Sequence, residues 1–260
     1  MSDWTYQKKL YEPNSKLPFT ISRSKLELLE NCPRCFYMDC RLGIGRPGFP
    51  PFTLNSAVDN LLKNEFDLLR KSGQKHALME QYGIDAIPYD HEDLPKWRGE
   101  VTGYRYIGIS CLHEPTNFKI TGMVDDVWQD SQGKLCIVDY KATSTTKQIS
   151  LDDQWKQGYK RQMEVYQWIF RQCGYNVSDT GYFVFANAKK DLERFDGKLE
   201  FEMSILTHEG KDSWVEGQIL KAKTLLDADQ IPAAASECEY CTYRRSSVEQ
   251  VSKFLKLHQK

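Results

Sequence analysis

The chain lacks long apolar runs, internal repeats and a large excess of charge of either sign. No stretch approaches the roughly 18 consecutive apolar residues of a membrane helix, so we expect no membrane contact. The first residues, Met-Ser-Asp-Trp-Thr-Tyr, contain no apolar segment of a secretory signal, and we therefore expect a cytoplasmic location. A formal net charge of −1 argues against tight, indiscriminate binding to polyanions through charge alone.

The 260 residues are 40% hydrophobic and 27% charged, which are ordinary values for a globular protein. This length allows one large α/β domain or two small ones. Because no segment has the composition of a linker, we predict one domain over residues 1–260. It comprises an N-terminal helical part (22–72), a core that carries the candidate site (103–206) and C-terminal helices (207–260).

Hydrophobic spacing predicts helices followed by strands and then a mixture of the two. Residues 1–20 are expected to form an irregular arm, and residues 73–100 have no clear pattern. The predicted elements are a short helix from Ser22 or Ser24 to Asn31, a loop over 43–51, a helix over 54–71, strands over 104–112, 118–128 and 134–141, a helix over about 152–173, strands over 181–186 and 199–206, a helix over about 212–228 and a last amphipathic helix. This order predicts an α/β fold with a single mixed sheet flanked by helices.

Four residues of the predicted strand 134–141 share one face, because strand side chains alternate. They are Leu135, Ile137, Asp139 and Lys141. Two apolar residues followed by two charged ones indicate a strand that runs out of the core into a cleft. The acid and the amine are then about 7 Å apart along the strand, so both can address one metal-bound water. A surface hairpin with solvated charges is the competing interpretation.

The preceding strand can bring a second carboxylate, Asp125, beside Asp139. Two neighbouring carboxylates repel each other unless a cation lies between them. Oxygen ligands of this kind suit Mg²⁺ or Mn²⁺, which polarise a phosphodiester and lower the pKa of bound water. Asp126 is the alternative to Asp125, although we favour its facing the other side of the strand.

Gln162 lies within the apolar stripe of the predicted helix 152–173, next to Tyr166 one turn later. An inward-facing glutamine is costly unless it finds hydrogen-bond partners. It either bonds to a backbone group in the core or reaches the charged site with the tyrosine beside it.

Together these motifs resemble the RecB-type branch of the PD-(D/E)XK nucleases, which includes nuclease domains of helicase–nuclease repair complexes and CRISPR-adaptation exonucleases. The matching motifs are Gly-X-X-Asp ending at Asp125, Asp139-Tyr140-Lys141, and Gln162-Met-Glu-Val-Tyr166. The similarity extends over about residues 22–245 and includes the upstream Cys-Pro-Arg-Cys-Phe-Tyr. It implies a restriction-endonuclease-like core.

The resemblance also implies roles for individual residues. Asp125 and Asp139 are expected to be metal ligands, with the Tyr140 carbonyl as another. Lys141 is the expected catalytic lysine, and Gln162 and Tyr166 are expected to contact the site or the DNA.

A further ligand in this family is usually a histidine on an early helix. Asp59 stands at the matching position of Asn55-Ser-Ala-Val-Asp59, and aspartate is a good ligand for Mg²⁺ or Mn²⁺. Glu65 is the reserve candidate on the same helix.

The eight cysteines include two CxxC pairs, Cys32/Cys35 and Cys238/Cys241, about 200 residues apart. If the fold brings the chain ends together, the pairs complete a four-thiolate site. A two-plus-two set suits zinc equally well, and the resemblance favours a 4Fe-4S cluster. Four unrelated buried thiols are the alternative. The single cysteines are expected to be buried, namely Cys40, Cys111, Cys136 and Cys173.

Basic residues with interleaved aromatic residues are candidate contacts to DNA. They are Lys147, Lys156, Lys160, Arg161, Arg244 and Arg245, with Trp155, Tyr159 and Tyr243. For each one alone, a solvated charge or a core aromatic ring is the better interpretation.

The resemblance implies a Mg²⁺- or Mn²⁺-dependent deoxyribonuclease acting in repair, recombination or defence. Single strands or DNA ends are the expected substrate, and a helicase or another repair or defence protein is the expected partner. Two alternatives stay open: a catalytically inactive nucleic-acid-binding module, and a metal or redox sensor built on the four cysteines.

Overall fold

The computed structural model describes residues 9–99 and 108–258. The strands in these ranges are β1 (Phe19–Ser22), β2 (Ala86–Pro88), β3 (Ile109–His113), β4 (Phe118–Gly122), β5 (Asp126–Asp130), β6 (Leu135–Thr143), β7 (Thr180–Ala188) and β8 (Phe201–Glu209). The helices are α1 (Arg23–Asn31), α2 (Pro33–Leu42), α3 (Thr53–Ser72), α4 (Ala77–Gln81), α5 (Leu94–Trp97), α6 (Gln157–Gln172), α7 (Ser213–Asp227) and α8 (Glu239–His258), with 3-10 turns at Glu114–Thr116 and Gln154–Lys156.

The mixed α/β class is confirmed, but the prediction of a single sheet was wrong. The described strands form a three-stranded sheet in the order β1-β4-β3 and a five-stranded sheet in the order β2-β5-β6-β7-β8. The predicted continuous strand 118–128 is two strands, β4 and β5, one in each sheet. The chain leaves the three-stranded sheet after Gly122, and the Val124 N–H then donates to the Trp97 carbonyl at 3.1 Å.

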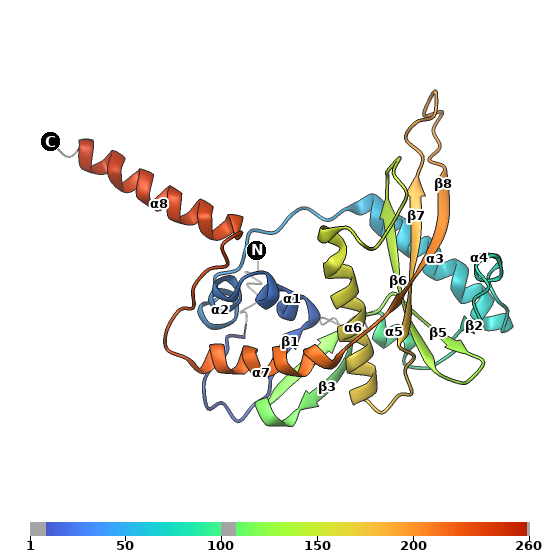
Figure 1. The fold of residues 1–260 in the computed structure, drawn as a ribbon, viewed down its shortest axis with the longest axis horizontal. Coiled ribbons are helices and arrows are strands. Elements are labelled where there is room, and N and C mark those ends of the chain that lie inside the picture. Colours follow the sequence, from blue (N-terminus) through green and yellow to red (C-terminus); the bar gives the residue numbers. More distant parts are fainter. Residues whose placement is uncertain (1–8, 100–107, 259–260) are drawn as a thin grey trace, which may run out of the picture.

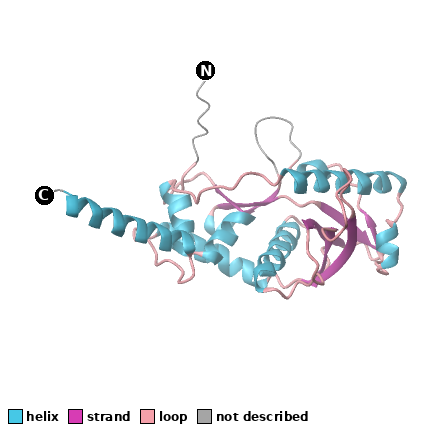
Figure 2. Cartoon of the chain, turned by 90° about the horizontal axis from the view of Figure 1, so that it is seen from above, coloured by secondary structure: helices cyan, strands magenta, loops and turns pink. Residues whose placement is uncertain are grey.

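The five-stranded sheet is curled and has helices on both faces (Figures 1 and 2). β6 and β7 are parallel neighbours, and α6 is the crossover between them, as a βαβ unit requires. Alternate β6 residues pack under α6 (Leu135, Ile137) and under α3 (Cys136, Val138). The strand is therefore apolar on both faces until it reaches Asp139.

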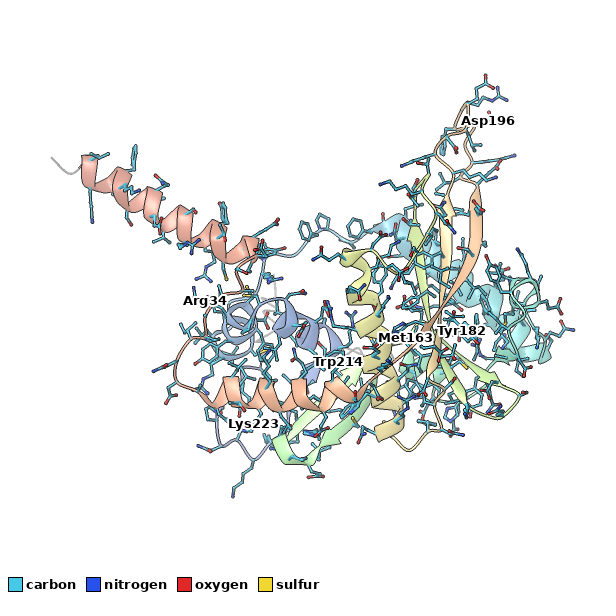
Figure 3. All side chains as sticks on the ribbon, in the orientation of Figure 1. Arg34, Met163, Tyr182, Asp196, Trp214 and Lys223 are labelled. Carbon is cyan, nitrogen blue, oxygen red and sulfur yellow. The ribbon has the colours of Figure 1, made fainter. Side chains whose placement is uncertain are left out.

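Close packing of α6 on the sheet depends on small residues in the strands. Figure 3 shows Met163 on α6 beside the strands, and a methyl group added to Gly181 would collide with its sulfur. At the far end of the sheet the connection between β7 and β8 stands out into solvent with Asp196 at its tip (Figure 3).

Several helices and strands were not predicted from the sequence. α2 begins directly at the first CxxC pair, because Pro33 is at its first turn, where proline needs no N–H partner. The unpatterned stretch 73–100 contains the short elements α4, β2 and α5. Of the predicted strand 104–112, residues 104–107 lie outside the described residues, and β3 covers the rest.

α7 returns across α1 and α2, so the C-terminal part of the chain lies against the N-terminal helices (Figure 1). α8 then extends away from the body in both views (Figures 1 and 2). None of the described helices combines the length and the hydropathy needed to span a bilayer.

Candidate active site and metal-binding cysteines

β6 carries Asp139 and Lys141 on the face that packs under α6, as the alternation predicts. Asp139 is only 1% exposed and forms an ion pair with Lys141. The Lys141 ammonium also lies 4.6 Å from the centre of the Tyr159 ring. Burial lowers the pKa of Lys141, but the carboxylates of Asp139 and Asp125 raise it above its ordinary value. Lys141 is therefore charged at neutral pH.

Asp125 immediately precedes β5, the strand next to β6, and lies beside Asp139. β5 and β6 are antiparallel, and Asp126 is paired with Val138. Asp125, one residue earlier, therefore lies opposite Asp139, one residue later. The Tyr140 N–H donates to Asp125 Oδ2 at 2.8 Å and orients the carboxylate. Burial, together with the charges of Asp139 and Asp59, raises the pKa of Asp125 to about 7. The site thus holds more negative charge than Lys141 and the nearby Lys63 balance.

Gln162 reaches the charged site and does not bond to the backbone. Its amide donates to Asp139 Oδ1 at 2.7 Å and lies 3.3 Å from the Tyr166 hydroxyl oxygen. Gly122 explains how the tyrosine fits, because a methyl group there would come within 2.6 Å of the Tyr166 ring. The glycine of the Gly-X-X-Asp motif therefore allows α6 to present Gln162 and Tyr166 to the site.

Asp59 faces the same site from α3. Its carboxylate accepts from Lys63 at 2.7 Å, and the Lys63 ammonium lies 3.9 Å from Asp125 Oδ1. Lys63 thus bridges the two walls, a role that the sequence gave no reason to expect. Glu65 was wrong as a reserve ligand: its side chain is 57% exposed and pairs with His76, because it lies on another side of α3.

A cavity of about 370 Å³ opens between α3 and the end of β6. Its lining includes Asp59, Asp125, Tyr140, Lys141 and Tyr159. Asp139 lies behind this lining, since it is 1% exposed and forms its ion pair with Lys141. Among the described residues only the four cysteines form a tight group of potential metal ligands, so Asp59, Asp125 and Asp139 are arranged more loosely. Oxygen ligands with excess negative charge nevertheless fit a hard divalent cation such as Mg²⁺ or Mn²⁺.

Behind the cavity a buried network holds its walls. Asp126 is 0% exposed and accepts from Arg70, from Arg98 at 3.1 Å and from the Tyr140 hydroxyl at 2.7 Å. Arg98 also donates to the Asp125 carbonyl at 2.9 Å and to both carboxylate oxygens of Asp67. Asp126 therefore faces away from the cavity, as favoured from the sequence, and the network fixes the backbone of Asp125 and the side chain of Tyr140.

The roles of the two arginines of this network, Arg70 and Arg98, were not predicted from the sequence. Arg98 follows α5 in the unpatterned stretch, and Arg70 lies in the last turn of α3. A buried arginine has no periodic signature of its own. The one available signal was the pair Asp125-Asp126: alternation sends one carboxylate to each face, and an inward carboxylate needs a cationic partner.

The two CxxC pairs meet, as predicted. Cys35 Sγ lies 3.6 Å from the sulfurs of both Cys238 and Cys241, and Cys32 Sγ lies 3.9 Å from that of Cys241. All four thiols are buried and lie within 4.8 Å of one another. Four soft ligands at this spacing form a site for one thiophilic metal ion.

The single cysteines are less uniform than expected. Cys40 and Cys136 are buried, but Cys111 is only half-buried and Cys173 is exposed. Cys173 departs from the prediction because α6 ends at Gln172 and leaves it at the end of the helix.

Part of the predicted DNA-contacting set is already engaged within the protein. Lys156 was wrong as a contact because it is 5% exposed and pairs with Asp153 at 2.9 Å. Arg161 forms a two-pronged ion pair with Glu27. Tyr159 is half-buried against Lys141, whereas Tyr243 is 75% exposed on α8.

The affinity for Mn²⁺ is expected to rise with pH. The Asp125 carboxyl, with a pKa of about 7, must lose its proton before it binds a cation. Below this pH the affinity should rise about tenfold per pH unit, and it should level off above it. Calorimetric titrations of Mn²⁺ across the neutral range measure this. Asp125→Asn should flatten the profile, and a wild-type affinity independent of pH contradicts the expectation.

Comparisons with known proteins agree with the geometry. The family model described as PD-(D/E)XK nuclease superfamily matches residues 20–246, a range that contains every motif of the cavity and both cysteine pairs. Among curated proteins, none matches the sequence. Since the match covers most of its length, the chain belongs to the PD-(D/E)XK nuclease superfamily.

Proposed function

We propose that this protein is a divalent-metal-dependent deoxyribonuclease of the RecB-type branch. One observation carries the proposal: Asp125 and Lys141 line one cavity, and the buried Asp139 lies directly behind it in an ion pair with Lys141. Gln162 of α6 bonds to the second carboxylate. The same order of motifs in that branch supports a DNA substrate, with single strands or ends favoured.

Each side chain has a distinct proposed task. Asp125 and Asp139 would hold Mg²⁺ or Mn²⁺, with the Tyr140 carbonyl and Asp59 as further ligands. Such an ion, when bound, polarises the phosphodiester and lowers the pKa of a bound water. Gln162 fixes the rotamer of Asp139 through its 2.7 Å hydrogen bond. Tyr166, which packs against Gly122, holds Gln162 in place.

In this proposal Lys141 acts as a charge. In the metal-free protein its raised pKa keeps the proton on Nζ at neutral pH, and this ammonium can donate to a phosphate oxygen or to the attacking water and offset the developing negative charge. The ring of Tyr159 at 4.6 Å restricts where the ammonium can move. The proton released by the water would pass to solvent or to the phosphate.

The biological setting is proposed from the same branch: DNA repair, recombination or defence, beside a helicase or another protein that supplies single strands. A cytoplasmic location is consistent with this setting. No disulfide joins any of the eight cysteines, as is usual for proteins of a reducing compartment.

The test is cleavage of labelled single- and double-stranded DNA by wild-type protein with Mn²⁺, Mg²⁺ or a chelator. Metal-dependent cleavage that disappears in Asp139→Asn supports the proposal. Failure of folded, metal-loaded protein to cleave any DNA or RNA would overturn it and favour a binding module.

We propose that zinc occupies the cysteine site, in place of the 4Fe-4S cluster that the resemblance favours. Thiolates at the usual Zn–S distance of about 2.3 Å around a tetrahedral ion lie about 3.8 Å from one another. Three of the Sγ separations, at 3.6, 3.6 and 3.9 Å, agree with that value, and all four sulfurs lie within 4.8 Å of one another. A cubane cluster places four irons and four sulfides between its cysteines and needs them farther apart.

Protein purified without oxygen is therefore expected to contain one zinc per chain and to lack the visible absorption of an iron–sulfur cluster. Elemental analysis by plasma mass spectrometry measures both metals. Cys35→Ser should lose the zinc and lower the melting temperature, because metal binding contributes to folding. Cys173→Ser is the matched control, because this thiol is exposed and lies outside the four-cysteine site. Brown protein with stoichiometric iron contradicts the assignment to zinc.

A further inference from the structure

The loop between α2 and α3 exposes two large aromatic rings. Phe49 is 79% exposed and Phe52 is 74% exposed. In Figure 1 this loop crosses the molecule from the N-terminal helices to the start of α3. Two aromatic rings exposed on one short loop can together form a binding surface.

The loop is held at both ends, so its rings have a defined place. The Ile44 N–H donates to the Met38 carbonyl at 2.9 Å. Arg46 lies 3.5 Å from Cys238 Sγ and stacks over the Tyr240 ring at 4.5 Å, which ties the loop to the cysteine site. At the other end the Phe52 carbonyl accepts from the Ser56 N–H at 3.0 Å.

The stretch between the two rings is stiff for a reason visible in the sequence. Pro50 and Pro51 fix their own φ angles and restrict the residues before them to extended conformations. Such a segment loses little conformational entropy when a ligand binds to it, which favours a preformed recognition surface.

Phe52 also lines the cavity that contains Asp125 and Lys141. Asn55 and Ser56 lie on the same wall together with Val58, so the ring stands beside polar as well as apolar groups. A ligand here must present a flat apolar surface next to groups that bind polar or charged atoms. An unpaired nucleotide has this combination, whereas the base faces of a duplex are already stacked on one another.

We infer that Phe52, assisted by Phe49, stacks on unpaired bases of the strand entering the cavity and so selects single-stranded substrate. This inference rests on the proposed nuclease function. A hydrophobic peptide or a second copy of the chain fits less well, because both would leave the charged cavity beside the ring without a complementary group.

The first experiment measures binding by fluorescence anisotropy, without divalent metal so that no cleavage occurs. The probes are a labelled oligothymidylate and an abasic oligonucleotide of the same length. Phe52→Ala should weaken binding of the oligothymidylate about tenfold, the scale of one lost stacking contact. Binding of the abasic strand should not change, and Phe52→Trp should retain the wild-type affinity.

Phe195→Ala is the matched control, since this phenylalanine is 71% exposed and lies on the connection between β7 and β8. Equal losses on both probes, no loss on either, or undetectable binding of the oligothymidylate by wild-type protein would overturn the inference.

Cleavage assays with Mn²⁺ separate this inference from the proposed function. If wild-type protein cleaves DNA but Phe52→Ala keeps the same preference for single over double strands, the stacking role fails and the nuclease stands. If wild-type protein cleaves nothing but the base-dependent binding loss is found, the nuclease fails and the stacking role stands.

Discussion

Replacing Lys141 with methionine is expected to lower the rate of DNA cleavage by about a hundred- to a thousandfold, the usual cost of losing one group that stabilises transition-state charge. Methionine keeps the length of the side chain and removes its ammonium. Asp139, at 1% exposure, would then lose its ion-pair partner. Single-turnover cleavage at saturating Mn²⁺ measures the chemical step, and the metal compensates for the charge of the aspartate in this assay.

Lys63 supplies the matched control for this substitution. Its ammonium reaches the same region, 2.7 Å from Asp59 and 3.9 Å from Asp125, but it pairs with α3 and not with β6. Lys63→Met is expected to change the rate by less than about tenfold, because a bound divalent cation would offset the charge of the same carboxylates. Equal losses in the two variants would show that only the total positive charge of the cavity matters.

Asp139, Lys141 and Gln162 could be found from the sequence because simple periodicities position them. The period of two along β6 places Asp139 and Lys141 on one face. The helical period places Gln162 above Tyr166, and the structure shows both at the charged site. Gly122 could be identified from the motif, but its reason, the close approach of the Tyr166 ring, needs coordinates.

The division of the strands into two sheets could not be predicted from these periodicities. Residues 118–128 are mostly strand-forming, and Gly122 with the Asp125-Asp126 pair gives only a weak local signal for a break. The break arises because the Val124 N–H bonds to the carbonyl of Trp97, in a stretch without periodicity. The partners of Asp126 come from the same stretch and from α3, so tertiary contacts alone specify the network.

The cysteine site shows a similar limit. Paired CxxC spacings predict that four thiols meet, and they do. The spacing in sequence is compatible with zinc and with a cluster, because both use four thiolates. Only the separation of the sulfurs in space distinguishes a single ion from a cubane.

The neighbours Asp125 and Asp126 are expected to respond in opposite ways to the same change. Asp126 is fully buried between Arg70 and Arg98, and removing one partner of such a pair leaves uncompensated buried charge. Asp126→Asn should lower the free energy of unfolding by about 3–5 kcal/mol. Urea denaturation in the presence of a chelator, slightly above neutral pH, measures this loss.

Asp125→Asn should abolish cleavage without that loss of stability. In metal-free protein the pKa of Asp125 is raised to about 7, so the folded state binds the proton more tightly than the unfolded chain does. The contribution of this carboxyl to stability is therefore present at acid pH and is lost as the pH rises through about 7. A neutral amide keeps an acceptor for the Tyr140 N–H and avoids the repulsion from Asp139, so above neutrality the variant should be at least as stable as wild type. Unfolding of Asp125→Asn at the urea concentration that unfolds Asp126→Asn would contradict the assignment of one aspartate to the cavity and the other to the core.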